Sequence, residues 1–140
     1  MLMMLASCFI CASMAIGFVL ALAHLRLTFF TRAFSPRDTA LEAGMRTIAP
    51  IISPKITMMQ GQTGFHATHS LGIITLSVVY GYLAIVYPAF FFASYFMVGF
   101  GAAILAAYAV IAKRYFFDVP FAGIAIALGC YVIGAVLAYA

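Results

Sequence analysis

Charged side chains are scarce in this sequence. Lys, Arg, Asp and Glu together make up 7% of its 140 residues, against roughly a quarter in ordinary soluble domains. Hydrophobic residues make up 67%, and the mean hydropathy is +1.18. A chain of this composition cannot present a polar surface to water, which excludes a soluble domain.

Signatures of catalysis are also absent. The sequence has no glycine-rich phosphate loop, no nucleophile elbow and no pair of carboxylates within an apolar run, the patterns that mark several large classes of enzyme. The net charge of +4 does not indicate nucleic acid, because five of the seven basic residues lie together between the first two apolar runs. Membrane topology places basic residues in such connections. Nothing in the sequence therefore indicates an enzyme.

The sequence does contain four long apolar runs. Each is close to the roughly 20 residues that a helix needs to cross a bilayer. The runs cover residues 2–25, 65–87, 89–112 and 120–139. We expect an all-α fold, a four-helix transmembrane bundle that forms a single integral membrane domain over residues 1–140.

The connection between the first two runs is predicted to hold a short amphipathic helix at residues 36–49. Ser35 and Pro36 are typical of a helix start, with Ser as the N-cap and Pro at the first helical position. Apolar residues then recur on one side, namely Leu41, Met45 and Ile48. Such a helix lies at the membrane surface. The same Ser-Pro pattern at Ser53 predicts that the next helix begins there.

Small residues recur at helical spacing within the spans. Small side chains let neighbouring helices approach closely, which is how membrane helices pack without a hydrophobic driving force. The predicted helix-packing residues are Gly17, Gly64, Thr68, Gly72, Gly99 and Gly129. These positions can serve helices of the same chain or of a partner.

A dense polar stretch runs from Gln60 to Gly72 and contains His66 and His69. Because the first span ends near His24 and the second begins near this stretch, we expect the three histidines to lie at a similar depth. Histidines at i and i+3, with a third from a neighbouring helix, could hold a metal ion, and histidines also ligate haem. A quinone site and proton transfer are further alternatives. Neither span contains a carboxylate to orient metal ligands, which favours interhelical hydrogen bonding instead.

Cys8 and Cys11 form a Cys-x-x-Cys pattern near the outer end of the first span. In a thioredoxin-like setting this spacing is redox-active. No alternation of strands and helices surrounds the pattern here, and thiols in apolar sequence act as small hydrophobic side chains. We interpret both cysteines as packing residues, with a dithiol relay to quinone as the alternative.

Three segments of the chain resemble one known family. They are Phe-Phe at 29–30 with Phe-Ser-Pro-Arg-Asp at 34–38, Gly-Phe-His-Ala-Thr-His-Ser-Leu-Gly at 64–72, and Arg-Tyr-Phe-Phe at 114–117 with Pro120. In this order the sequence is similar to an uncharacterised family of small bacterial four-span membrane proteins, DoxX-like in size. That family typically has Asn at the position of His66, so the resemblance gives His69 the larger structural role. It implies the four-span architecture and no established activity.

The charged residues all lie in the connections 26–55 and 113–118, which share one side of a four-span chain. The positive-inside rule predicts that both connections face the cytoplasm and that both termini lie outside a bacterial inner membrane. The expected function is that of a non-catalytic accessory or scaffolding subunit of a larger membrane complex, with the lipid bilayer and other membrane subunits as partners. The alternative is a small redox or cofactor-binding protein in which His24, His66 and His69 hold haem, a metal ion or a quinone.

Overall fold

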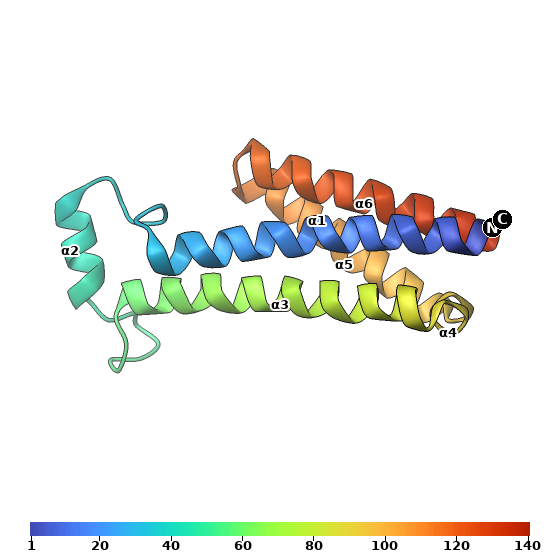
Figure 1. Cartoon of the computed structure of the whole chain (residues 1–140). Helices are drawn as coiled ribbons and strands as arrows, with labels where there is room; N and C mark the ends of the chain where they lie inside the picture. Colours follow the sequence, from blue (N-terminus) through green and yellow to red (C-terminus); the bar gives the residue numbers. More distant parts are fainter. The chain divides into compact units, whose positions relative to one another are not determined.

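The computed structural model describes residues 1–140 and contains helices and no strands (Figure 1). The helices are α1 (Leu2–Phe30), α2 (Thr39–Thr47), α3 (Met58–Val86), α4 (Pro88–Ala93), α5 (Tyr95–Tyr115) and α6 (Asp118–Tyr139). Four of them, α1, α3, α5 and α6, are long and apolar enough to cross a membrane. The predictions of an all-α fold and of four apolar spans are confirmed.

The residues group into two compact units. The first consists of Met1–Leu20 with Ile73–Ala140, and the second of Ala21–Gly72. The first unit therefore holds the larger part of α1, the end of α3 and all of α4 to α6. The second holds the end of α1, α2 and the beginning of α3. The expectation of one integral membrane domain over the whole chain stays a prediction.

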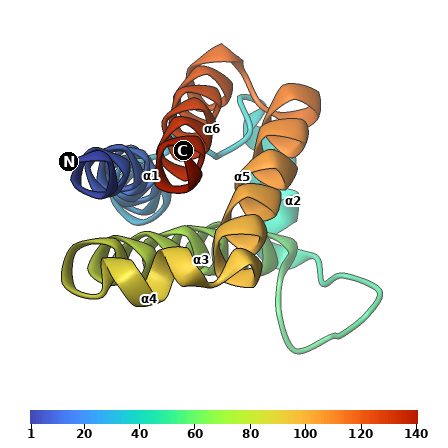
Figure 2. The same cartoon turned by 90° about the vertical axis from the view of Figure 1, so that its right-hand side faces the viewer.

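The first unit is a helical bundle with aromatic side chains in its core. Its buried residues come from five helices and include Ile10, Met14, Tyr80, Phe91, Phe92, Val98, Leu105 and Tyr131. α5 packs against α6, its neighbour along the chain (Figure 2). Buried tyrosines need a partner for the hydroxyl, since an unpaired one is costly away from water. The hydroxyls of the two buried tyrosines donate to backbone carbonyl oxygens, Tyr80 to Met97 at 3.1 Å and Tyr131 to Val98 at 3.1 Å. The exposed Tyr139 donates to Phe92 in the same way at 2.9 Å.

Two glycines of the first unit stand where helices come closest. A Cβ built on Gly134 of α6 would lie 2.9 Å from the carbonyl oxygen of Ala6 in α1. One built on Gly101 of α5 would lie 2.6 Å from the Tyr80 ring and would overlap the Tyr131 hydroxyl. Neither position was among the predicted packing residues. An α-helix that is apolar on every side gives no pattern from which its inward face can be read.

Of the predicted packing residues, Gly17 makes a close contact inside the chain. A Cβ there would stand 3.1 Å from the hydroxyl oxygen of Ser77. Three others have no atom of the chain within 4 Å of such a Cβ, namely Gly64, Gly99 and Gly129. Thr68 and Gly72 are exposed as well. These five residues thus lie on outward faces, and the packing within the chain does not use them.

α2 begins later than predicted because another residue caps it. Its N-cap is Asp38, whose carboxylate accepts hydrogen bonds from the backbone N–H groups of Ala40 at 2.8 Å and Leu41 at 3.0 Å. A carboxylate in this position also interacts favourably with the helix dipole. The predicted start at Ser35 is therefore wrong.

α3 begins at Met58, neither at Ser53 nor at residue 65. Thr57 and Gln60 form a capping box. The Gln60 backbone N–H donates to the Thr57 hydroxyl at 3.2 Å, and the Thr57 N–H donates to the Gln60 side-chain oxygen at 2.9 Å. The Thr-x-x-Gln signal is present in the sequence and is the stronger helix start, because it satisfies two backbone donors at once.

Two further boundaries differ from the predicted spans. α1 continues past residue 25 to Phe30. The predicted span 89–112 is divided at Ser94, whose hydroxyl caps α5 by accepting from the Met97 N–H at 3.2 Å. The helix that follows is long enough to cross a membrane without the residues of α4.

Candidate functional site

The second unit brings the three histidines of the sequence together. His24 Nε2 of α1 and His66 Nδ1 of α3 are 3.0 Å apart, a hydrogen bond in which one ring nitrogen donates and the other accepts. The His69 ring stands edge-on to the His24 ring, with centroids 5.3 Å apart. All three side chains are half-buried. His66 makes this hydrogen bond to α1. The larger structural role that the family resemblance gives to His69 stays a prediction.

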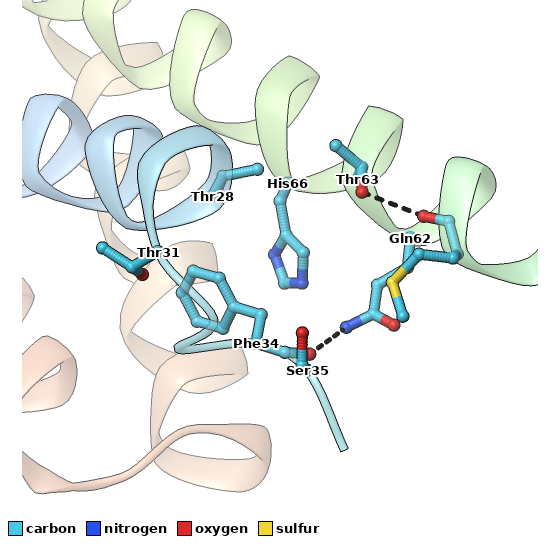
Figure 3. Close-up of a pocket in the computed structure, with 8 residues that line it drawn as sticks. Thr28, Thr31, Phe34, Ser35, Gln62, Thr63 and His66 are labelled. Carbon is cyan, nitrogen blue, oxygen red and sulfur yellow. Dashed lines mark hydrogen bonds between the residues drawn. The ribbon is translucent and has the colours of Figure 1, made fainter. Parts of the chain in front are cut away.

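Phe34 completes this cluster, and no sequence pattern had marked it as a site residue. Its ring stacks on His66 with centroids 4.4 Å apart and lies 4.7 Å from the His24 ring. Gln62 donates from Nε2 to the Phe34 carbonyl oxygen at 2.9 Å, which fastens the segment after α1 to α3 (Figure 3). The sequence holds 14 phenylalanines, and one of them outside a periodic helix carries no signal that would single it out.

A small polar cavity lies beside the cluster. Its volume is about 40 Å³. It is lined by Thr28, Thr31, Phe34, Ser35, Met59, Gln62, Thr63 and His66 (Figure 3). A buried water needs roughly 10–15 Å³ of such space, so the cavity has room for a few waters or one small ion. Pockets for organic cofactors are roughly 300–1,000 Å³, so this cavity is much smaller than such a pocket.

The threonine hydroxyls at the cavity are already bonded. Thr28, Thr31 and Thr63 each donate to the backbone carbonyl four residues earlier, at 2.8, 2.7 and 2.9 Å. No group of three or more His, Cys, Asp or Glu side chains is arranged to hold a metal ion. His24 and His66 come nearest to such a site, but the two nitrogens that face each other share a hydrogen bond. The arrangement is a polar cluster bonded within the chain.

A second polar contact in this unit joins the end of α1 to α2. The Glu42 carboxylate accepts hydrogen bonds from Arg46 at 2.8 Å and from Arg32. The bond from Arg46, aided by Arg32, holds the pKa of the Glu42 carboxyl below its ordinary value, against a smaller opposing effect of burial. Arg37 and Lys55, in the same connection, form no ion pair. The positive charge of the connection is therefore only partly neutralised.

The cysteines of the sequence are free thiols. Cys8 is exposed, whereas Cys11 packs against the buried core of the first unit. This place suits a packing residue. The dithiol relay stays an untested alternative for the pair.

Comparison with known proteins gives no family for the chain. No family model, no curated protein and no solved structure matches it. The resemblance carried by residues 64–72 stays a prediction.

Proposed function

We propose that this chain is a non-catalytic structural subunit of a larger protein assembly in a bacterial inner membrane. The observation that supports this most is the open space beside Gly64, Gly99 and Gly129, which lie on three different apolar helices. Glycine inside a helix is less favourable than alanine by roughly 0.5–1 kcal/mol, and packing within the chain does not require it at these positions. In a membrane, small residues on an outer face let a partner helix approach closely.

The polar cluster supports the same proposal. The facing nitrogens of His24 and His66 are bonded to each other, and Gln62 is bonded to the backbone of Phe34. Side chains that satisfy one another hold two helices together, whereas a ligand site needs groups left to face the ligand. Membership of the family of small bacterial four-span proteins is part of this proposal and gives the same architecture.

The proposed orientation follows from charge. The connections 26–55 and 113–118 carry every Lys and Arg of the chain, and basic connections remain on the cytoplasmic side. Both termini then lie on the outer, periplasmic side. The bilayer and the neighbouring subunits are the proposed partners.

Native mass spectrometry after extraction in mild detergent tests the structural role. We expect the chain to leave the membrane together with at least one other protein subunit. The double variant Gly99→Leu, Gly129→Leu should release that subunit, because the larger side chains fill the open faces. Helix content should not change, since no atom of the chain lies near either position. Val110→Leu is the matched control, at an exposed position of α5 that is already large.

The proposal would be contradicted if the wild-type chain and the double variant were both recovered from the native membrane without any other subunit. A subunit that is retained by the double variant would show that the open glycine faces are not the contact.

Binding of a small metal ion is a second candidate function. The observation that favours it is the 3.0 Å approach of ring nitrogens from His24 and His66, with the His69 ring adjacent. Elemental analysis and an absorption spectrum of the purified protein test it. A stoichiometric metal, or a haem band, that is lost in both His66→Ala and His69→Ala would replace the structural role. A colourless, metal-free protein would leave the structural role in place.

A further inference from the structure

The segment between α2 and α3 is a loop whose two ends are joined. The backbone N–H of Met58 donates to the carbonyl oxygen of Ile48 at 2.9 Å. This bond closes residues 49–57 into a loop whose two ends are adjacent. In Figure 1 this loop lies between the end of α2 and the start of α3. Compact surface loops of this kind, with closed ends, are frequently functional.

The tip of the loop is a turn made by two isoleucines. The Ser53 N–H donates to the Pro50 carbonyl oxygen at 3.1 Å, which places Ile51 and Ile52 at the two central positions. Their exposed fractions are 108% and 90%. Gly, Asn, Asp and Pro dominate such positions, each for a conformational reason that isoleucine lacks. Two fully exposed isoleucines at a turn therefore have no explanation in the turn itself.

A positive charge lies beside this apolar tip. Lys55 is exposed, and its backbone N–H donates to the Ser53 hydroxyl at 3.2 Å, which keeps it beside the turn. Its ammonium group forms no ion pair. The same connection exposes apolar side chains of α2 and its C-cap, Leu41 and Ile48. Apolar side chains beside uncompensated cations are the combination that anionic lipid attracts.

We propose that the turn at Ile51 and Ile52 inserts into the leaflet surface next to the loop, where anionic lipid headgroups contact Lys55. The inference goes beyond the proposed subunit role and rests on the proposed placement of the four helices in a bilayer. It assigns the isoleucines to the boundary between headgroups and acyl chains. Lys55 lies among the phosphates, which supply the negative charge that no carboxylate of the chain gives it.

The absence of tryptophan from the chain allows a direct test. Ile51→Trp and Ile52→Trp each create a protein with one tryptophan, whose fluorescence reports only on that position. The full chain is placed in nanodiscs of phosphatidylglycerol or of phosphatidylcholine, with one copy in each disc to exclude cover by a second copy. Lipids brominated near the headgroup quench an inserted tryptophan, and iodide quenches one in water.

We expect both turn tryptophans to show blue-shifted emission and quenching by brominated lipid in phosphatidylglycerol, with a weaker effect in phosphatidylcholine. Lys55→Gln should remove the difference between the two lipids. Ala43→Trp is the control for the preference of tryptophan itself, since Ala43 is exposed on the opposite side of α2 from Leu41 and Ile48.

Val78→Trp, at an exposed position of α3, tests the membrane placement separately. Suppose that brominated lipid quenches Val78→Trp, whereas iodide quenches both turn tryptophans as strongly as it quenches Ala43→Trp. That result would overturn the loop inference alone. Val78→Trp without lipid quenching would overturn the placement as well. Equal insertion in both lipids would overturn the role of anionic headgroups.

Discussion

At the scale of single residues, the His66 ring carries the hydrogen bond that joins α3 to α1. His66→Ala removes this bond and the stacking on Phe34, so we expect the free energy of unfolding to fall by about 0.6–2 kcal/mol. An asparagine amide can accept and donate close to where the imidazole nitrogen stood, so His66→Asn should retain most of the stability. Thermal unfolding in detergent measures both. If His66→Asn is as unstable as His66→Ala, the stacking rather than the hydrogen bond is the stabilising contact.

Pairs of glycines on one helix test the packing at the same scale. Gly101→Ala and Gly134→Ala force a Cβ against the Tyr80 ring and the Ala6 carbonyl oxygen, and overpacking of this kind costs about 1–3 kcal/mol. Gly99→Ala and Gly129→Ala meet no atom of the chain and should leave stability unchanged or slightly raised. Denaturation in detergent compares each member with its partner on α5 or α6. An equal loss of stability for both glycines of one helix would mean that the helix turns a different face toward its neighbours.

At the scale of secondary-structure elements, Glu42 of α2 pairs with Arg46 of the same helix and with Arg32, which follows the end of α1. The pKa of Glu42 lies below its ordinary value in the fold. The stabilisation is therefore complete above the ordinary glutamate pKa of about 4.3 and is lost as pH falls through the lower, folded value. The protection of the α2 amides against hydrogen exchange, taken relative to the intrinsic exchange rate at each pH, should fall over that acidic window.

Glu42→Gln provides the control for this pH dependence. The amide cannot ionise, so the variant should show lower protection of α2 at neutral pH and no further loss of protection from this residue on acidification. An unchanged exchange rate in Glu42→Gln at neutral pH would show that α2 is held by other contacts.

The number and type of the long helices could be predicted from the sequence, but their ends and faces could not. Four apolar runs of the right length suffice for four helices. The start of α2 depends on Asp38 rather than Ser35, and Glu42 pairs with Arg32 across the loop that precedes α2. Local capping patterns cannot decide between Ser35 and Asp38 as the N-cap of α2. The three histidines were recognisable as a group, whereas Phe34 entered the cluster through a tertiary contact.

At the scale of the whole molecule, the distribution of charge predicts the topology. In a variant without native thiols, a cysteine at Arg37 should not react with a membrane-impermeant thiol reagent in intact cells. A cysteine at Ala89, exposed in α4 near the uncharged connection, should react. The native thiols to replace are Cys8, Cys11 and Cys130. The reverse pattern of labelling would place the basic connections outside the cell and overturn the proposed orientation.

The three tyrosine hydroxyls of the first unit have a consequence for how its helices are oriented about their own axes. Helices with apolar side chains all round gain little from turning one side or another toward lipid, so solvation alone leaves their rotation undetermined. Tyr80, Tyr131 and Tyr139 each reach a different carbonyl oxygen at the start of α5 or in α4. A rotation of α5 about its axis by one residue would break the hydrogen bonds from Tyr80 and Tyr131 at the same time. The hydrogen bonds of these tyrosines thus fix the rotation of the helices about their axes, which contacts between apolar side chains alone do not fix.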